Sequence, residues 1–424
     1  MFTGTDKVRD ILLLTTLALM LLIPAGRLRP PARQQELRVL ISARNMVQSG
    51  DWLRPEFQNQ PRYRKPPLPY WLAAAAMLPD RLTDSAARAR LPFALVALGT
   101  LYTLYALSGS RTPPLLLLAS FGFWRFAPLA ETDLVNTFGI LLAMLGFQKQ
   151  RGTLTALGMT ASILSKGPAG LVIPLLTFVC MFRAQPRPLR WWLTALMPPL
   201  LAGAGWLGFL LNDPVARSSL EAEIRDTFLN SPNRRSVLFY FYTLPAMLGP
   251  ALFFAFPRSR PTCPLRLPWV WFATTFLLLS LTDSKQNHYT LMLLPPTVWL
   301  LAGFAPRKHL GLLTALALCL GSGADLWRNR THADALHSRF LRSVRPHADS
   351  AGTLFVVGIN SARFDFHLGR HVHNRESAAQ TFREALSGDA VVVVQRRDRY
   401  DGGQIDTPHD AGDPDWQRFM LLRP

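Results

Sequence analysis

Long apolar runs alternate with short polar connections through most of the chain. The runs carry few charges, and several approach the roughly 20 residues that an α-helix needs to cross a bilayer. They lie near residues 11–25, 91–108, 113–127, 134–148, 153–165, 168–182, 191–211, 237–256, 268–281, 289–304 and 309–326. The pattern predicts a polytopic α-helical membrane protein with about 11 transmembrane helices.

The connections between these runs differ in charge, and the difference predicts an orientation. Alternate connections carry the basic residues Lys7 and Arg9, Arg111, Lys149 and Arg151, Arg183 with Arg187 and Arg190, Arg258 with Arg260 and Arg266, and Arg307 with Lys308. The positive-inside rule places these connections and the amino terminus in the cytoplasm, provided that the short apolar run 68–78 does not span. A first loop over 26–90, the other connections and everything after about residue 327 then lie on the outer side.

The composition changes near residue 328, where the apolar runs end. Thr353–Ile359 and Ala390–Gln395 have the pattern of buried strands, and Glu376–Leu386 has a helical pattern. We therefore expect two domains, a transmembrane domain over 1–327 and a small soluble α/β domain over 328–424 on the outer side.

Composition narrows the class of partner. The 424 residues are 49% hydrophobic and 17% charged, with a formal net charge of +19. The basic residues form short clusters at the ends of apolar runs and not one basic face, so we expect anionic membrane lipids and phosphates as partners and no nucleic acid. The three cysteines, Cys180, Cys263 and Cys319, have neither paired spacing nor histidine neighbours, so neither a disulfide framework nor a cysteine zinc site is expected. No metal or cofactor is assigned from the sequence.

The first outer loop has the most distinctive sequence. An amphipathic helix is predicted over Glu36–Gln48, and Gly50 is placed to cap its carboxyl end. An extended segment rich in proline follows and ends in Tyr63-Arg64-Lys65-Pro66-Pro67.

This loop resembles that of a known superfamily. Its sequence R-x-x-x-x-A-R-N-M-V-x-S-G-D-W, followed by Y-R-K-P-P-L-P-Y-W, is similar to the first periplasmic loop of bacterial C-type (GT-C) glycosyltransferases, such as the aminoarabinose transferase of lipid A and relatives of the protein O-mannosyltransferases. The resemblance covers about residues 33–300. It implies an enzyme of the bacterial inner membrane that transfers a sugar from a polyprenyl-phosphate donor to a periplasmic acceptor, namely lipid A, another envelope glycan or a protein.

Two segments of the chain correspond to acidic motifs of the superfamily. The superfamily usually begins its first loop with an Asp-Glu pair, whereas this chain has Gln35-Glu36, so only the second acid is retained. Glu131-Thr132-Asp133 matches a second motif, Thr-Asp before an apolar helix. Glu36 and Asp133 are therefore the expected catalytic residues. The loss of the first acid favours an anionic acceptor or a base supplied by Glu36.

Cations suit the donor phosphate, and the resemblance assigns several of them. Lys65 matches the lysine that contacts the carrier phosphate, but the acid that commonly precedes it is Arg64 here, which argues against a metal at this position. Lys166 lies in a Ser-Lys-Gly-Pro corner that resembles the superfamily's Thr-Lys-Gly-Pro. The expected substrate-binding residues are Arg38, Tyr63, Lys65, Lys166, Arg234, Lys285, His288 and Tyr289.

Two other functions remain open at this level. Gln35 and Arg64 are compatible with a non-catalytic descendant that binds polyprenyl phosphate or lipid as a partner subunit. A transporter is the weakest alternative, because no internal repeat is found and most charges lie at loop edges.

Overall fold

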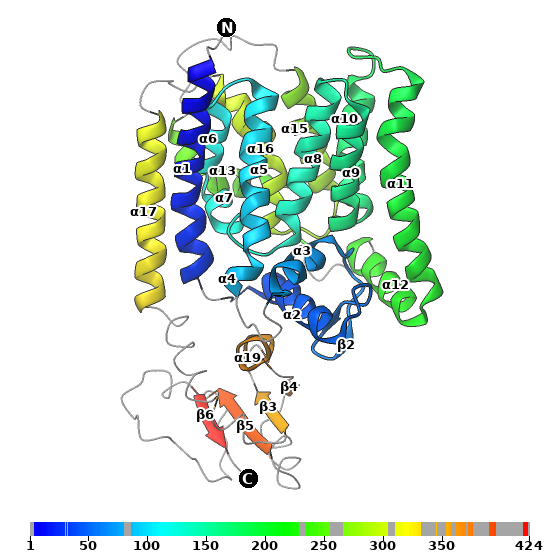
Figure 1. Cartoon of the computed structure of the whole chain (residues 1–424), viewed down its shortest axis with the longest axis vertical. Helices are drawn as coiled ribbons and strands as arrows, with labels where there is room; N and C mark the ends of the chain where they lie inside the picture. Colours follow the sequence, from blue (N-terminus) through cyan, green and yellow to red (C-terminus); the bar gives the residue numbers. More distant parts are fainter. Residues whose placement is uncertain are drawn as a thin grey trace.

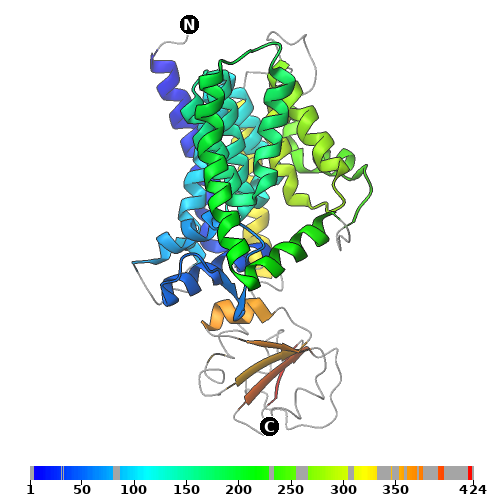
Figure 2. The same cartoon turned by 90° about the vertical axis from the view of Figure 1, so that its right-hand side faces the viewer.

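The structure is a computed structural model. It describes residues 4–29, 31, 33–79, 86–228, 234–254, 266–303, 310–331, 345, 353–357, 361–369, 372–375, 390–395 and 419–422. Long helices run side by side in one bundle, shorter elements lie across one end of it, and a sheet follows beyond that end (Figure 1). The view turned by 90° shows the same three levels (Figure 2).

The apolar runs form the bundle. Its helices are α1 (Gly4–Leu28), α5 (Leu91–Ser108), α6 (Thr112–Ala119), α7 (Phe121–Phe126), α8 (Thr132–Gln148), α9 (Gly152–Lys166), α10 (Pro168–Met181), α11 (Leu189–Asn212), α13 (Phe239–Leu248), α14 (Pro250–Phe254), α15 (Arg266–Leu281), α16 (Thr290–Ala302) and α17 (Leu310–Thr331). Among the described residues, three helices are long and apolar enough to cross a membrane, at Thr5–Arg27, Ala86–Ser108 and Leu189–Asn212. The chain is a mainly helical membrane protein, and the number of its spans stays a prediction.

Two predicted runs are interrupted where the sequence pattern showed one continuous segment. Run 113–127 divides into α6 and α7 because Ser120 adopts an extended conformation between them. Run 237–256 divides at Gly249, whose φ of +51° is readily available only to glycine. Hydrophobic pattern alone did not predict these breaks, because apolar residues continue on both sides of each.

Helices α8 and α9 approach closely through small residues. A Cβ atom added at Gly158 would lie 2.5 Å from the backbone N of Ala143 and 2.5 Å from the backbone O of Gly139. A Cβ at Gly139 would lie 2.4 Å from Oγ of Ser162. Small residues let helix backbones pack at such distances in membranes. The packing of α8 against α9 places the start of α8 beside the end of α9.

We expect Gly158→Ala to destabilise the protein by about 1–3 kcal/mol or more, because the backbone of α8 must move to admit the methyl group. Gly205→Ala in α11 is the matched control, since nothing lies within 4 Å of the Cβ that it would add. Thermal unfolding in detergent measures the difference. Equal unfolding temperatures for the two variants would contradict this description of the α8–α9 contact.

The first loop and its neighbours cover one end of the bundle. They comprise α2 (Gln34–Ser49), β1 (Glu56–Phe57), β2 (Gln60–Pro61), α3 (Leu68–Met77), α4 (Ala86–Ala89), the 3-10 helix η1 (Asn287–Tyr289) and, on the far side, α12 (Pro214–Phe228). The helix predicted over 36–48 is confirmed as α2. Gly50 caps it in the left-handed conformation at φ +77° and donates its N–H to the carbonyl of Met46.

A mixed sheet lies beyond this end. Its order is β4 (His373–Arg375), β3 (Thr353–Val357), β5 (Ala390–Gln395) and β6 (Phe419–Leu422), parallel except for β6. The strands predicted in 353–359 and 390–395 are thus present, whereas the helix predicted over 376–386 lies outside the described residues. The domain boundary near residue 328 stays a prediction.

A buried ion pair joins this region to the first loop. In α19 (Ser361–Leu368), Asp365 accepts a hydrogen bond of 2.6 Å from Nη2 of Arg44 in α2, and its carbonyl accepts another of 3.0 Å from Nη1. Both side chains are buried. Figure 2 shows α19 between the bundle and the sheet, so the sheet region is anchored on α2.

Candidate functional site

Asp133 lies at the start of α8, on the end of the bundle that the first loop covers. Its side chain is buried and forms an ion pair with Nζ of Lys166, the last residue of α9. Nε2 of His288, in η1, lies 3.6 Å from the second carboxylate oxygen. Burial lowers the pKa of His288 to about 4, although the charge of Asp133 opposes this, so the imidazole is neutral at pH 7.

Lys166 is held from a second side by an aromatic ring. Its Nζ lies 3.8 Å from the centroid of the Tyr289 ring, which is a cation–π distance. Gly167 follows with φ +70° and ψ −149°, a conformation that directs the chain sharply into α10. Lys166 therefore sits in a tight corner, between a carboxylate and the face of an aromatic ring.

Lys65 adds a third cationic side chain from the first loop. The Cβ position at Gly167 lies 3.8 Å from Cγ of Pro66, so the loop rests against this corner. The Lys65 charge acts on Asp133, Lys166 and His288. We call Lys65, Asp133, Lys166, His288 and Tyr289 the Asp133 cluster; all five were predicted as site residues.

A second carboxylate lies two residues before Asp133. Glu131 is only 1% exposed, and its Oε1 accepts a hydrogen bond of 2.6 Å from Nε of Arg33. The Arg33 guanidinium also stacks 4.8 Å from the centroid of the Phe126 ring. Within the described residues, Oε2 of Glu131 is buried and accepts no hydrogen bond. Burial raises the pKa of Glu131 to about 7, and the Arg33 charge only partly offsets the effect.

Sequence reasoning assigned no role to Glu131 or Arg33. Glu131 belongs to the Glu131-Thr132-Asp133 motif, and its place directly before the apolar run was a usable signal. Nothing local marked Arg33, because its partner lies 98 residues away in the chain.

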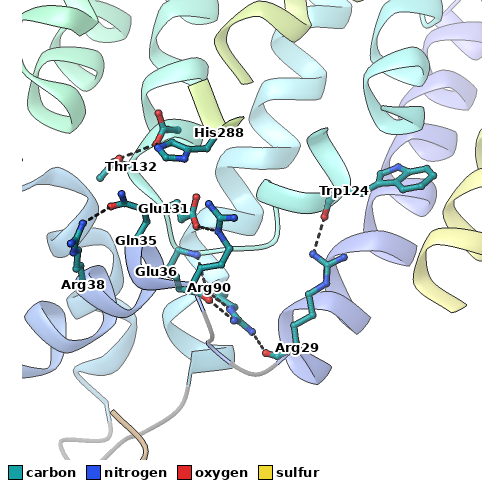
Figure 3. A network of polar contacts seen from close by, with 12 residues as sticks. Arg29, Gln35, Glu36, Arg38, Arg90, Trp124, Glu131, Thr132 and His288 are labelled. Carbon is teal, nitrogen blue, oxygen red and sulfur yellow. Dashed lines mark hydrogen bonds and ion pairs between the residues drawn. The ribbon is translucent and has the colours of Figure 1, made fainter. Parts of the chain in front are cut away.

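Glu36 is in a different environment from Asp133. It is completely buried, and Arg90 grips it with two hydrogen bonds, from Nε to Oε1 at 2.6 Å and from Nη2 to Oε2 at 2.8 Å (Figure 3). The backbone N–H of Ala130 donates a third at 3.1 Å. The remaining Arg90 nitrogen donates to the carbonyls of Gly26 and Arg29. Glu36 thereby ties α2 to the ends of α1 and α4 and to the segment before α8.

Two further predicted residues come from the first loop. Arg38, half-buried on α2, donates to Oε1 of Gln35 at 3.3 Å (Figure 3). The hydroxyl of Tyr63 donates to Asp213 at 3.3 Å, at the junction of α11 and α12. Burial, reinforced by the Asp213 charge, raises the pKa of Tyr63 to about 12.

The remaining predicted residues, Arg234 and Lys285, lie near each other in facing segments. Arg234 is bridged to Ser284 and lies 3.8 Å from Asp283, with its side chain 79% exposed. Nζ of Lys285 is buried and donates to the carbonyl of Thr282. The contacts described for these two residues thus lie within segment 282–285 and between it and Arg234, and not with the Asp133 cluster.

No set of three or more His, Cys, Asp or Glu side chains lies together as a metal site would require, as far as the described part of the chain extends. The charges gathered at this end of the bundle are instead carboxylates matched with lysine and arginine. Such an arrangement suits an anionic ligand that displaces part of an existing ion pair.

The fold has close counterparts among solved structures. ArnT from Cupriavidus metallidurans in the apo state superposes with a TM-score of 0.77, over 99% of this chain and 98% of that one, at 14% sequence identity. The same protein bound to undecaprenyl phosphate gives a TM-score of 0.75 with the same identity and coverage. The match extends over nearly the full length of both chains.

Sequence comparison finds relatives whose descriptions name no function. Two uncharacterized proteins of Aquifex aeolicus (strain VF5) match, one at 30% identity over 304 residues and the other at 22% over 319 residues. The first match covers 65% of this chain and 60% of the relative, and the second covers 71% and 74%. No protein-family model matches the chain.

Proposed function

We propose that this chain, which has the GT-C glycosyltransferase fold of ArnT, transfers a sugar from a polyprenyl-phosphate donor to an acceptor at the outer side of the inner membrane. The Asp133 cluster carries the proposal, because it gathers a carboxylate, two lysines, a neutral histidine and a tyrosine at one end of the helical bundle. ArnT bound to undecaprenyl phosphate supports a polyprenyl-phosphate ligand for the same fold.

The cations would bind the donor phosphate. Transfer breaks the bond between the sugar's anomeric carbon and a phosphate oxygen, so negative charge grows on the departing polyprenyl phosphate. Lys65 is half-buried in the loop that rests against the Gly167 corner, and Lys166 is fixed beside it. Preorganised ammonium groups stabilise such charge without reorganisation when the reaction occurs.

Asp133 would hold this arrangement in its reactive state. Its charge offsets part of the cost of burying the Lys166 ammonium group, and its second oxygen faces His288 and Thr132. With one oxygen paired with Lys166, Asp133 can use its second oxygen, near His288, to bind a sugar hydroxyl or the acceptor. We therefore retain Asp133 as a catalytic residue.

We assign Glu36 a positioning role, in place of the catalytic role expected from the sequence. Its two carboxylate oxygens already accept three hydrogen bonds, from Arg90 and from the backbone of Ala130. A carboxylate held by three hydrogen bonds has little freedom to follow a substrate. Its contact with Ala130 fixes the segment that leads into Glu131 and Asp133.

A binding protein without catalysis is not favoured. The fold is that of a glycosyltransferase, and the substitution of Gln35 for an acid leaves Glu131 and Asp133 in place at the same end of the bundle. The terminal sheet and the first loop would both face the periplasm, where lipid A, another envelope glycan or a protein is the acceptor.

Lys65→Ala is expected to weaken binding of undecaprenyl phosphate by about 10- to 100-fold, which corresponds to one lost charge-assisted contact. Lys149→Ala is the control, because Lys149 is an exposed lysine at the opposite end of α8. Titration of each purified variant with undecaprenyl phosphate measures the two affinities. Equal losses would mean that both lysines contact lipid headgroups without selectivity.

The activity itself is tested with purified full-length protein. A panel of radiolabelled undecaprenyl-phosphate sugars is incubated with cell envelope, and transfer of label into lipid, glycan and protein fractions is counted. Label entering one fraction only in the presence of the protein is the expected result. No transfer from any donor that binds would argue for a non-catalytic role.

A further inference from the structure

We propose that Glu131 is the catalytic base, which accepts the proton of an acceptor hydroxyl while Asp133 stays engaged with Lys166. This inference rests on the proposed function and specifies the chemistry of the acceptor as a hydroxyl group. It gives a role to Glu131, a carboxylate to which the sequence motifs assigned none.

The unpaired oxygen of Glu131 is the first observation. The side chain is 1% exposed, Oε1 is held by Arg33, and Oε2 is buried without a hydrogen-bond donor among the described residues. Buried polar atoms nearly always have a partner, so an open carboxylate oxygen requires an explanation. A substrate hydroxyl that donates to Oε2 would complete the site.

Glu36, Glu131 and Asp133 differ in how many partners their carboxylate oxygens have. Glu36 accepts three hydrogen bonds, and Asp133 pairs with Lys166 while facing His288. Glu131 alone of these three has an oxygen without a described partner. Gln35 carries no carboxylate, so a base for a hydroxyl acceptor comes from another side chain, and Glu131 is the one of these three with an open oxygen.

The charges around Glu131 suit proton transfer near neutral pH. Arg33 faces it from the start of α2, and Lys166 from α9, and both favour the ionised form. Glu36 and Asp133 are negative neighbours that oppose ionisation, together with burial. A base works best when its pKa lies near the working pH, and these opposing influences place Glu131 there.

The step balances as a substitution at the anomeric carbon. The acceptor oxygen bonds to the anomeric carbon, the bond from that carbon to the phosphate oxygen breaks, and polyprenyl phosphate leaves with the electron pair. The hydroxyl proton moves to Oε2 of Glu131, which becomes a neutral carboxylic acid. Proton release to solvent or to the departing phosphate restores the carboxylate.

The test compares Glu131→Gln and Glu131→Asp with the wild type and with Glu56→Gln, an exposed control in the first loop. Transfer of label from the undecaprenyl-phosphate sugar is measured from pH 5.5 to 9, and undecaprenyl phosphate binding is measured in parallel. Wild-type transfer should rise through about pH 7. Glu131→Gln should lower transfer at least about 100-fold and lose this rise while binding changes less than about threefold. Glu131→Asp should retain part of the activity.

The outcomes separate this inference from the proposed function. Transfer by Glu131→Gln with the wild-type rate and pH profile would overturn the role of Glu131 and leave the glycosyltransferase intact. Absence of transfer by the wild type itself would overturn both. If Glu131→Gln fails to bind undecaprenyl phosphate, infrared titration of the wild-type carboxyl groups tests the role of Glu131 instead. A protonated carboxyl signal that disappears near pH 7 together with the rise in transfer supports the inference, and a flat activity profile contradicts it.

Discussion

Asp133→Asn should abolish sugar transfer, with a loss of about 100-fold to 10,000-fold. The amide cannot carry the charge that pairs with Lys166, so a buried ammonium is left beside a neutral group. Lys166 then loses its proton or its position, and the donor phosphate loses a preorganised cation. The transfer assay with labelled undecaprenyl-phosphate sugar measures the effect on kcat and KM separately.

Asp283→Asn provides the matched control for this prediction. Asp283 also lies near a basic side chain, Arg234, but the Arg234 side chain is 79% exposed, Asp283 is half-buried, and neither belongs to the Asp133 cluster. Exposed ion pairs contribute little, so transfer by this variant should stay within about threefold of the wild type. An Asp133→Asn protein that folds, binds undecaprenyl phosphate and transfers sugar normally would remove Asp133 from the catalytic residues.

Arg90→Ala should have the second largest effect, which is a loss of folding stability. Removing the guanidinium leaves the Glu36 carboxylate buried without its ion-pair partner, and it removes one hydrogen bond from each of the carbonyls of Gly26 and Arg29. Breaking a buried ion pair by removing one partner costs about 3–5 kcal/mol. Folded protein recovered from membranes and the unfolding temperature in detergent should both fall sharply.

Arg88→Ala, an exposed neighbour on α4, is the control and should behave like the wild type. Glu36→Gln separates the positioning role from a catalytic one. The amide keeps one hydrogen-bond acceptor, so the fraction that folds should transfer sugar with a kcat near that of the wild type. Normal stability of Glu36→Gln combined with a large loss of kcat would restore Glu36 to the catalytic residues.

Local pattern predicted the elements of this fold well and their interruptions poorly. The run of apolar residues, the helix α2 and its glycine cap depend on residues within a few positions of each other, so the sequence displays them directly. The division at Ser120, where the backbone is extended between α6 and α7, lies inside a long apolar run, and no glycine or proline at that position signals it.

The site shows the same limit. Asp133, Lys166, His288 and Tyr289 were recognised in separate motifs, and the close packing of α8 on α9 brings the first two together. The pairing of Glu36 with Arg90 spans 54 residues and joins a motif residue to one without any motif. Charge partners at such separations follow from the folded topology, so the sequence did not reveal that Glu36 is paired with Arg90.

The central claim is that the chain moves a sugar from polyprenyl phosphate to an envelope acceptor. Mass spectrometry of lipids and envelope glycans from a deletion strain tests it most directly, with complementation by the wild type and by Asp133→Asn. We predict that one sugar-loaded polyprenyl phosphate accumulates, that one envelope species loses the same sugar mass, and that only the wild type reverses both changes. Unchanged donor and acceptor pools in the deletion strain, or full reversal by Asp133→Asn, would contradict the account.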